Sequence, residues 1–156
     1  MHRISWPPLG GAIAGLGATV VMSAAMLAAR RAGLTPTLPP ERIAEAAIEE
    51  TTDRPAGREE RTLVASVAHF GFGAAAGAVF GVIRHAAGIR GPIASVAGAL
   101  LFANLVYVTS YQGWVPALRI MPPASSDDAG RVGTMVVAHW VYGAVLGALA
   151  WVVGRR

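Results

Sequence analysis

Four long apolar windows, separated by polar connections, dominate the pattern of this chain. They cover residues 8–29, 62–83, 92–112 and 132–153, and they hold almost no charged residue. A helix of about 20 apolar residues crosses a hydrocarbon core of ~30 Å, whereas core helices of soluble proteins rarely reach that length. The pattern therefore predicts an all-α, polytopic membrane protein. We expect its four transmembrane helices to form a single membrane domain over residues 1–156.

The connection between the first two windows, residues 30–61, is long and acidic, with seven of the nine acidic residues of the chain. Its segment PPERIAEAAIEETTD begins with prolines that suit a first helical turn and places Ile43, Ala47 and Ile48 on one face. We predict a short interfacial helix near residues 40–52. Its apolar side either rests on the membrane or the bundle, or docks a partner protein.

The second and fourth windows carry related sequences. VAHFGFGAAAGAVFGV at 67–82 and VAHWVYGAVLGALAWV at 137–152 are identical at eight of 16 positions. A Pro-Pro pair also follows the first and the third window, in Leu38-Pro39-Pro40 and Met121-Pro122-Pro123. We interpret this as a 2+2 parallel internal repeat about an axis along the membrane normal. Chance similarity between Ala- and Gly-rich helices is the alternative.

Charge and composition fit a membrane location. Only 14% of the residues are charged and the mean hydropathy is +0.50, against about 25% charged residues in a soluble domain. All 13 basic residues are arginines that flank the windows, so we expect them to meet the lipid bilayer and not nucleic acid. The absence of cysteine excludes disulfides, thiolate metal sites and thiol nucleophiles.

The orientation is predicted from the arginines. Those on the acid-free face are Arg3, Arg84, Arg90, Arg155 and Arg156. Because that face consists of short segments, we predict that it is cytoplasmic and that both termini lie there. A count of arginine alone favours the opposite orientation, with the long loop in the cytoplasm.

Two of the four histidines lie inside the windows. His69 and His139 each stand seven residues into their helices, about 10 Å below the same membrane face. Four other polar side chains lie at a comparable depth: Asn104, Tyr107, Tyr142 and Ser23. An unsatisfied polar group in hydrocarbon costs several kcal/mol, so we predict that these groups face inward and pair as one polar layer.

Glycines follow each histidine at intervals of four residues: Gly73 and Gly77 after His69, and Gly143 and Gly147 after His139. Such GxxxG stripes let helices approach closely, within the chain, in a homo-oligomer or in a larger membrane complex. The alternative is that the glycines admit a flat haem b with the two histidines as axial ligands, which would make the protein an electron carrier. Without a carboxylate in the windows, these histidines form no complete site for another metal.

The sequence contains no nucleophile–base set, phosphate-binding loop or hydrolase metal motif. We therefore predict a non-catalytic membrane protein, either stress-related or an accessory subunit of a membrane complex. A pH sensor, which uses the titration of histidine between pH 5 and 8, and a small transporter are further alternatives.

The Pro-Pro pairs, the helices that open on histidine and the run GPIASVAGALLFANLVYVTSYQGWVPALRIMPP resemble the YagU-like inner-membrane proteins. The resemblance extends from Leu9 onward, apart from the acidic segment 41–61. It implies a bacterial inner-membrane location, a link to survival in acid and no known catalysis. It places His69 and His139 at the positions of that family's helix histidines.

Overall fold

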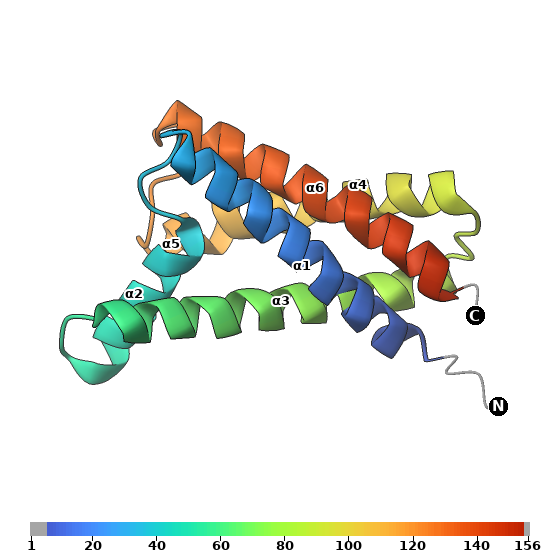
Figure 1. Ribbon diagram of the computed structural model, residues 1–156, viewed down its shortest axis with the longest axis horizontal. Coiled ribbons are helices and arrows are strands. Elements are labelled where there is room, and N and C mark those ends of the chain that lie inside the picture. The colour runs from blue at the N-terminus through green and yellow to red at the C-terminus, as the bar shows by residue number, and fades with distance from the viewer. Residues whose placement is uncertain (1–5, 155–156) are drawn as a thin grey trace.

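The computed structural model describes residues 6–154, which form helices and no strand (Figure 1). Four helices are long and apolar enough to cross a membrane. They are α1 (Pro7–Arg31), α3 (Arg58–Ala86), α4 (Pro92–Thr109) with its continuation to Ala117, and α6 (Ala129–Gly154). The predicted all-α fold with four membrane-crossing helices is confirmed. Three arginines used to predict the orientation, Arg3, Arg155 and Arg156, lie outside the described residues.

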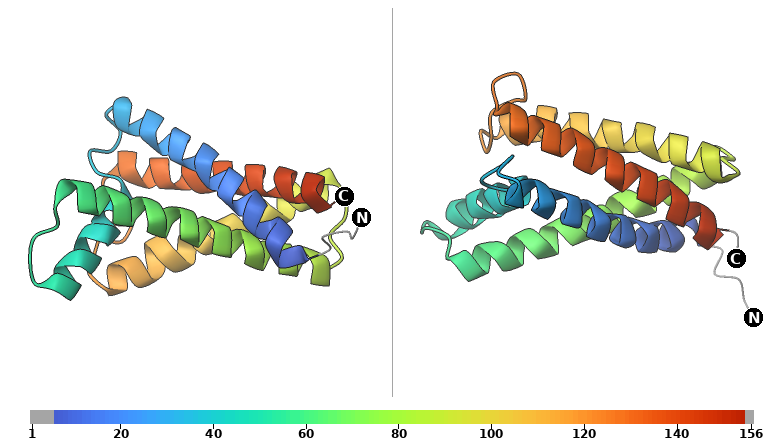
Figure 2. Two further views of the ribbon diagram at one scale, coloured as in Figure 1. Left: turned by 60° about the horizontal axis from the view of Figure 1, so that its bottom comes forward. Right: turned by 45° about the horizontal axis from the view of Figure 1, so that its top comes forward.

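The helices α1 and α6, first and last along the chain, pack against each other at the centre of the bundle. On the outer side, α3 packs against α1 and α4 packs against α6. By contrast, α3 and α4 make few contacts with each other, although a short turn joins them. Figure 2 (right) shows α3 leaving that turn and separating from α4 toward the end where α2 (Pro39–Thr52) lies.

This packing does not show the internal repeat. If α1 corresponded to α4 and α3 to α6, the pair α1–α3 would match the pair α4–α6, and both pairs do pack extensively. The two-fold rotation that exchanges the two halves would also turn the central α1–α6 contact into an α3–α4 contact of similar extent. The structure has only a slight contact there. The 2+2 repeat therefore stays a hypothesis from the sequence.

Glycines lie where the helices cross most closely. A Cβ added to Gly77 of α3 would approach the backbone of Gly11 and Gly15 of α1 to less than 3.0 Å. In the other half of the bundle, a Cβ on Gly147 of α6 would lie 2.5 Å from Val96 Cα of α4. Backbones in contact gain dispersion energy along the whole crossing, and this is a main source of helix association in lipid. Both predicted glycine stripes thus lie at helix contacts within the chain.

The short helix α2 lies close to its predicted range of 40–52, and it packs against α3. Ala44 and Ile48 are buried, whereas Ala47, which the sequence placed on the same face, is exposed. Arg30 at the end of α1 forms an ion pair with Glu41 of α2 at 2.8 Å. Ion pairs and apolar contacts therefore hold α2 on the bundle.

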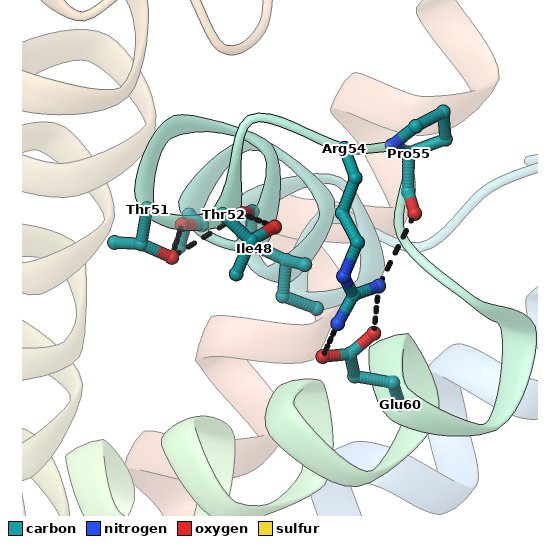
Figure 3. Close-up of polar contacts among 7 residues, drawn as sticks. Ile48, Thr51, Thr52, Arg54, Pro55 and Glu60 are labelled. Atoms are coloured by element: carbon teal, nitrogen blue, oxygen red, sulfur yellow. Dashed lines mark hydrogen bonds and ion pairs between the residues drawn. The ribbon is translucent and has the colours of Figure 1, made fainter.

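The segment after α2 is fixed by polar contacts (Figure 3). The hydroxyls of Thr51 and Thr52 donate to the carbonyl oxygen of Ile48 in the last turn of α2. Arg54 donates two hydrogen bonds, of 2.8 and 2.9 Å, to the carboxylate of Glu60. The hydrogen bonding to Glu60 and the negative charge of its carboxylate raise the pKa of the Arg54 guanidinium. These contacts tie the connection between α2 and α3 to the start of α3.

The third membrane-crossing helix extends further than its predicted window of 92–112. After α4 the chain forms a π-helix, η1 (Ser110–Trp114), and then the short helix α5 (Val115–Ala117). The backbone N–H of Val115 donates to the carbonyl oxygen of Ser110, which is the i→i+5 bond of a π turn. Pro116 has no N–H and its ring clashes with the carbonyl four residues earlier in a regular helix. The wider turn lets the helix continue through this proline.

Candidate functional site

A cavity of about 210 Å³ lies inside the bundle, where α3 and α4 separate. Side chains of α1 and α6 line it, among them Thr19, Met22 and Met135. The walls are formed by α3 on one side and by the end of α4 with η1 on the other. Pro39 and Pro40 of α2 line it at the polar end of the bundle. Every membrane-crossing helix therefore contributes to this space.

Both membrane histidines line the cavity. His69 comes from α3, and its Nε2 atom is buried without a hydrogen-bond partner among residues 6–154. His139 comes from α6, and its Nδ1 atom lies 2.8 Å from the carbonyl oxygen of Met135, one turn earlier in the same helix. A carbonyl oxygen only accepts hydrogen bonds, so Nδ1 of His139 carries the proton. In the neutral imidazole the Nε2 atom then presents a lone pair.

The other members of the predicted polar layer divide into two groups. Tyr142 donates from its hydroxyl to the Gly73 carbonyl oxygen at 2.8 Å and so links α6 to α3 beside the cavity. Tyr107 contacts the His139 ring edge-on, with the ring centroids 5.4 Å apart. Asn104, in contrast, lies on the exposed face of α4 and accepts a hydrogen bond of 3.1 Å from the Trp140 indole.

Ser23, the last member of that layer, is half-buried on α1 and is not among the residues that line the cavity. The structure thus gathers the two histidines and Tyr142 around one space, and Tyr107 lies against His139 without lining the cavity. It places Asn104 and Ser23 elsewhere.

The hydroxyl groups that line the cavity already have partners. Thr19 donates to the Gly15 carbonyl oxygen, Ser110 to that of Val106, Tyr142 to that of Gly73, and Tyr111 to the carboxylate of Asp127. The remaining lining is largely apolar. Nε2 of each histidine and the indole N–H of Trp114 are therefore among the polar side-chain atoms of the lining that have no partner among residues 6–154.

The cavity opens sideways between α3 and η1. Phe72 of α3 is 53% exposed and Trp114 of η1 is 40% exposed, and both line the space. Phe72 stands about 15 Å below the start of the second apolar window at residue 62. Because this residue lies near the middle of an apolar window, we expect the opening to face the hydrocarbon core of the membrane.

A polar cluster holds η1 in place, and the sequence pattern did not indicate it. Tyr111 of η1 donates from its hydroxyl to Asp127, whose carboxylate also pairs with Arg131 of α6 at 2.6 Å. The side chain of Asp127 is only 3% exposed. A π turn next to a cavity is a common feature of functional sites. The π turn, unlike the polar cluster, has a signal in the sequence: Gly113 and Pro116 lie close to the end of an apolar window.

The arrangement does not fit a haem b. The haem hypothesis needs free space for the porphyrin beside Gly77, Gly143 and Gly147. In the structure, neighbouring helices already occupy the space beside each of these glycines. Gly73 does line the cavity, but a Cβ there would meet the Thr19 side chain. A dry cavity of about 150 Å³ binds a single benzene ring, so 210 Å³ is far too small for a tetrapyrrole.

The sequence was also compared with known proteins. The profile of a family of unknown function (DUF6789) matches residues 7–156, almost the whole chain. The chain belongs to this family. Membership of DUF6789 brings no assigned activity, and the match does not test the narrower resemblance to YagU-like proteins, which stays a prediction. No curated protein and no solved structure matches the chain significantly.

Proposed function

We propose that this DUF6789 protein is a non-catalytic membrane protein that binds one lipid-soluble molecule in the cavity between α3 and α4. The observation that carries the proposal is the cavity itself, about 210 Å³ in volume, with exposed Phe72 and Trp114 at its opening within the apolar part of the bundle. A molecule dissolved in the membrane enters by such an opening without passing through water. The size suits one substituted ring or a short apolar segment.

The frame around the cavity supports binding. Close glycine contacts fix α1 against α3 and α4 against α6, so each wall is braced by a neighbouring helix. The Tyr142 hydroxyl bond to α3 and the Tyr111–Asp127 bond fix the walls at the level of the cavity. A preformed cavity binds with little cost in ordering its own side chains.

The chemistry of the lining supports a role in binding and not in catalysis. No carboxylate is among the lining residues, and Asp127, which accepts a hydrogen bond from the lining residue Tyr111, is paired with Arg131. The lining hydroxyls donate to carbonyl or carboxylate oxygens, so none is paired with a base that would activate it as a nucleophile. Roles as a stress-related protein or as an accessory subunit are compatible with such a binding protein.

Photolabelling tests the proposal. The probe is decylbenzene with a diazirine on its ring, added to the protein in lipid nanodiscs and irradiated. We expect labelled peptides from the cavity walls around Met22 and Met135. The substitution Ala76→Phe, which fills the cavity, should remove that labelling, whereas Ala75→Phe on the adjacent exposed position should retain it. Labelling confined to exposed membrane-facing residues such as Leu101 would overturn the proposal.

We further propose residence in the bacterial inner membrane with both termini in the cytoplasm. The turn between α3 and α4 lies on the side of the termini, because Gly154 contacts Arg84. Since the chain has no cysteine, single cysteines report the orientation directly. In intact cells, a membrane-impermeant maleimide should label Ser126→Cys and leave His85→Cys unlabelled. The reverse pattern would show the opposite orientation.

A further inference from the structure

We infer that the cavity selects a ring that carries a hydroxyl group, so that its ligand is a monocyclic phenol or hydroquinone on an apolar tail. This inference rests on the proposed function and adds the chemical class of the ligand. It is carried by the juxtaposition of two imidazoles without a complete set of partners, an aromatic lining and a volume that fits one ring.

The two histidines supply the polar groups of the cavity. The hydrogen bond of His139 Nδ1 to its own helix turns the opposite ring atom, Nε2, away from that helix, and the ring lines the cavity. This lone pair calls for a donor. His69 Nε2 is buried and has no partner within the described part of the chain. A buried nitrogen of this kind keeps the cost of its desolvation until a ligand or a water satisfies it.

A hydroxyl group fits this pair because it donates one hydrogen bond and accepts others. It donates to the lone pair of His139. Because this uses its only proton, the hydroxyl accepts a hydrogen bond from His69, which therefore carries its own proton on the ring nitrogen that faces the ligand. A ketone or ether oxygen only accepts and leaves the lone pair of His139 without a donor. A carboxylate has the same defect and also brings a charge into the hydrocarbon region.

The apolar lining and the volume of the cavity suit a single ring. Phe72, Tyr111, Trp114 and Tyr142 line the cavity together with the two imidazoles. Aromatic groups favour offset-stacked and edge-to-face contacts with another ring. An apolar cavity of about 150 Å³ holds benzene, so 210 Å³ holds a ring with small substituents. The tail leaves through the opening between Phe72 and Trp114 into the membrane.

A competition experiment tests the inference in the whole protein. Three compounds of one shape, 4-decylphenol, 4-decylanisole and decylbenzene, compete with the photoreactive decylbenzene in nanodiscs. We expect 4-decylphenol to displace it at about one tenth of the concentration that the other two need, as one to two net hydrogen bonds would give. His69→Phe and His139→Phe should each reduce this preference by about threefold or more. His85→Phe, at an exposed position outside the cavity, serves as the control.

The outcomes separate the two proposals. If none of the compounds displaces the probe from the cavity peptides, the proposed function fails. If all three compete equally, an apolar ligand or a lipid chain fills the cavity and only the hydroxyl inference fails. If the anisole matches the phenol, the ligand is an acceptor and the assignment of a donor to His139 is wrong.

A second measurement does not depend on the folding of variants. In protein labelled with ¹⁵N-histidine, 4-decylphenol should shift the Nε2 resonance of His139, and decylbenzene should not. An unchanged Nε2 resonance at saturating phenol would overturn the inference even if the histidine variants lose binding.

Discussion

The substitution Gly77→Ala tests whether the close α1–α3 crossing holds the bundle together. The added Cβ would lie 2.6 Å from Gly15 Cα, whereas ordinary contact begins at 3.4 Å. The two helices therefore have to separate by at least about 0.8 Å at this point, because the Gly11 carbonyl oxygen lies closer still to the added Cβ. A gap of ~0.5–1 Å forfeits about a quarter to a half of the dispersion energy of each contact along the crossing. Overpacking of this kind costs about 1–3 kcal/mol.

The matched control is Gly71→Ala on the same helix, where an added Cβ has no neighbour within 4 Å. Both variants gain the same helix propensity of up to about 1 kcal/mol, so their difference isolates the clash. Unfolding is followed by circular dichroism during titration of the detergent-solubilised protein with SDS. We expect Gly77→Ala to be less stable than Gly71→Ala by about 1–3 kcal/mol. Equal stabilities would refute the role given to this crossing.

Three further predictions concern single contacts. Tyr142→Phe should lower the free energy of unfolding by about 0.5–1.5 kcal/mol, because its hydroxyl bond between α6 and α3 is lost; an unchanged SDS midpoint would contradict this. Gly147→Ala should destabilise the α4–α6 pair by about 1–3 kcal/mol relative to Gly133→Ala, whose Cβ meets nothing within 4 Å. Arg30→Gln should remove the exposed ion pair with Glu41, at a cost of up to about 1 kcal/mol, and speed amide exchange in α2 at low salt. If exchange in α2 responds equally in 1 M NaCl, the ion pair is not its cause.

The positions of the helices could be predicted because length and apolar composition decide which segments cross a membrane. The short helix α2 could be predicted because its apolar side chains recur with a helical period on an otherwise charged segment. The two histidines meet in one cavity as their equal depth suggested. Depth along a membrane helix follows directly from residue number and rise.

The rotation of α4 about its axis could not be predicted. This helix is apolar on all sides, so no change in polarity marks its inner face. Asn104 was therefore expected inside the bundle and instead pairs with Trp140 on the exposed side. The π turn was missed for a related reason, since a change from i→i+4 to i→i+5 bonding leaves the apolar composition unchanged. The cavity depends on both features, because η1 forms one of its walls.

The central contact between α1 and α6 has a consequence for how the protein is made. Of the four membrane-crossing helices, α1 is synthesised first and α6 last. The helix α1 ends at Arg31, and α6 is complete only at Gly154. At about 5–20 residues per second, α1 waits roughly 6–25 s for this partner. Its glycine face is covered earlier, when α3 enters the membrane. We therefore expect the bundle to assemble in two steps, from an α1–α3 pair that inserts first and an α4–α6 pair that closes the cavity at the end of synthesis.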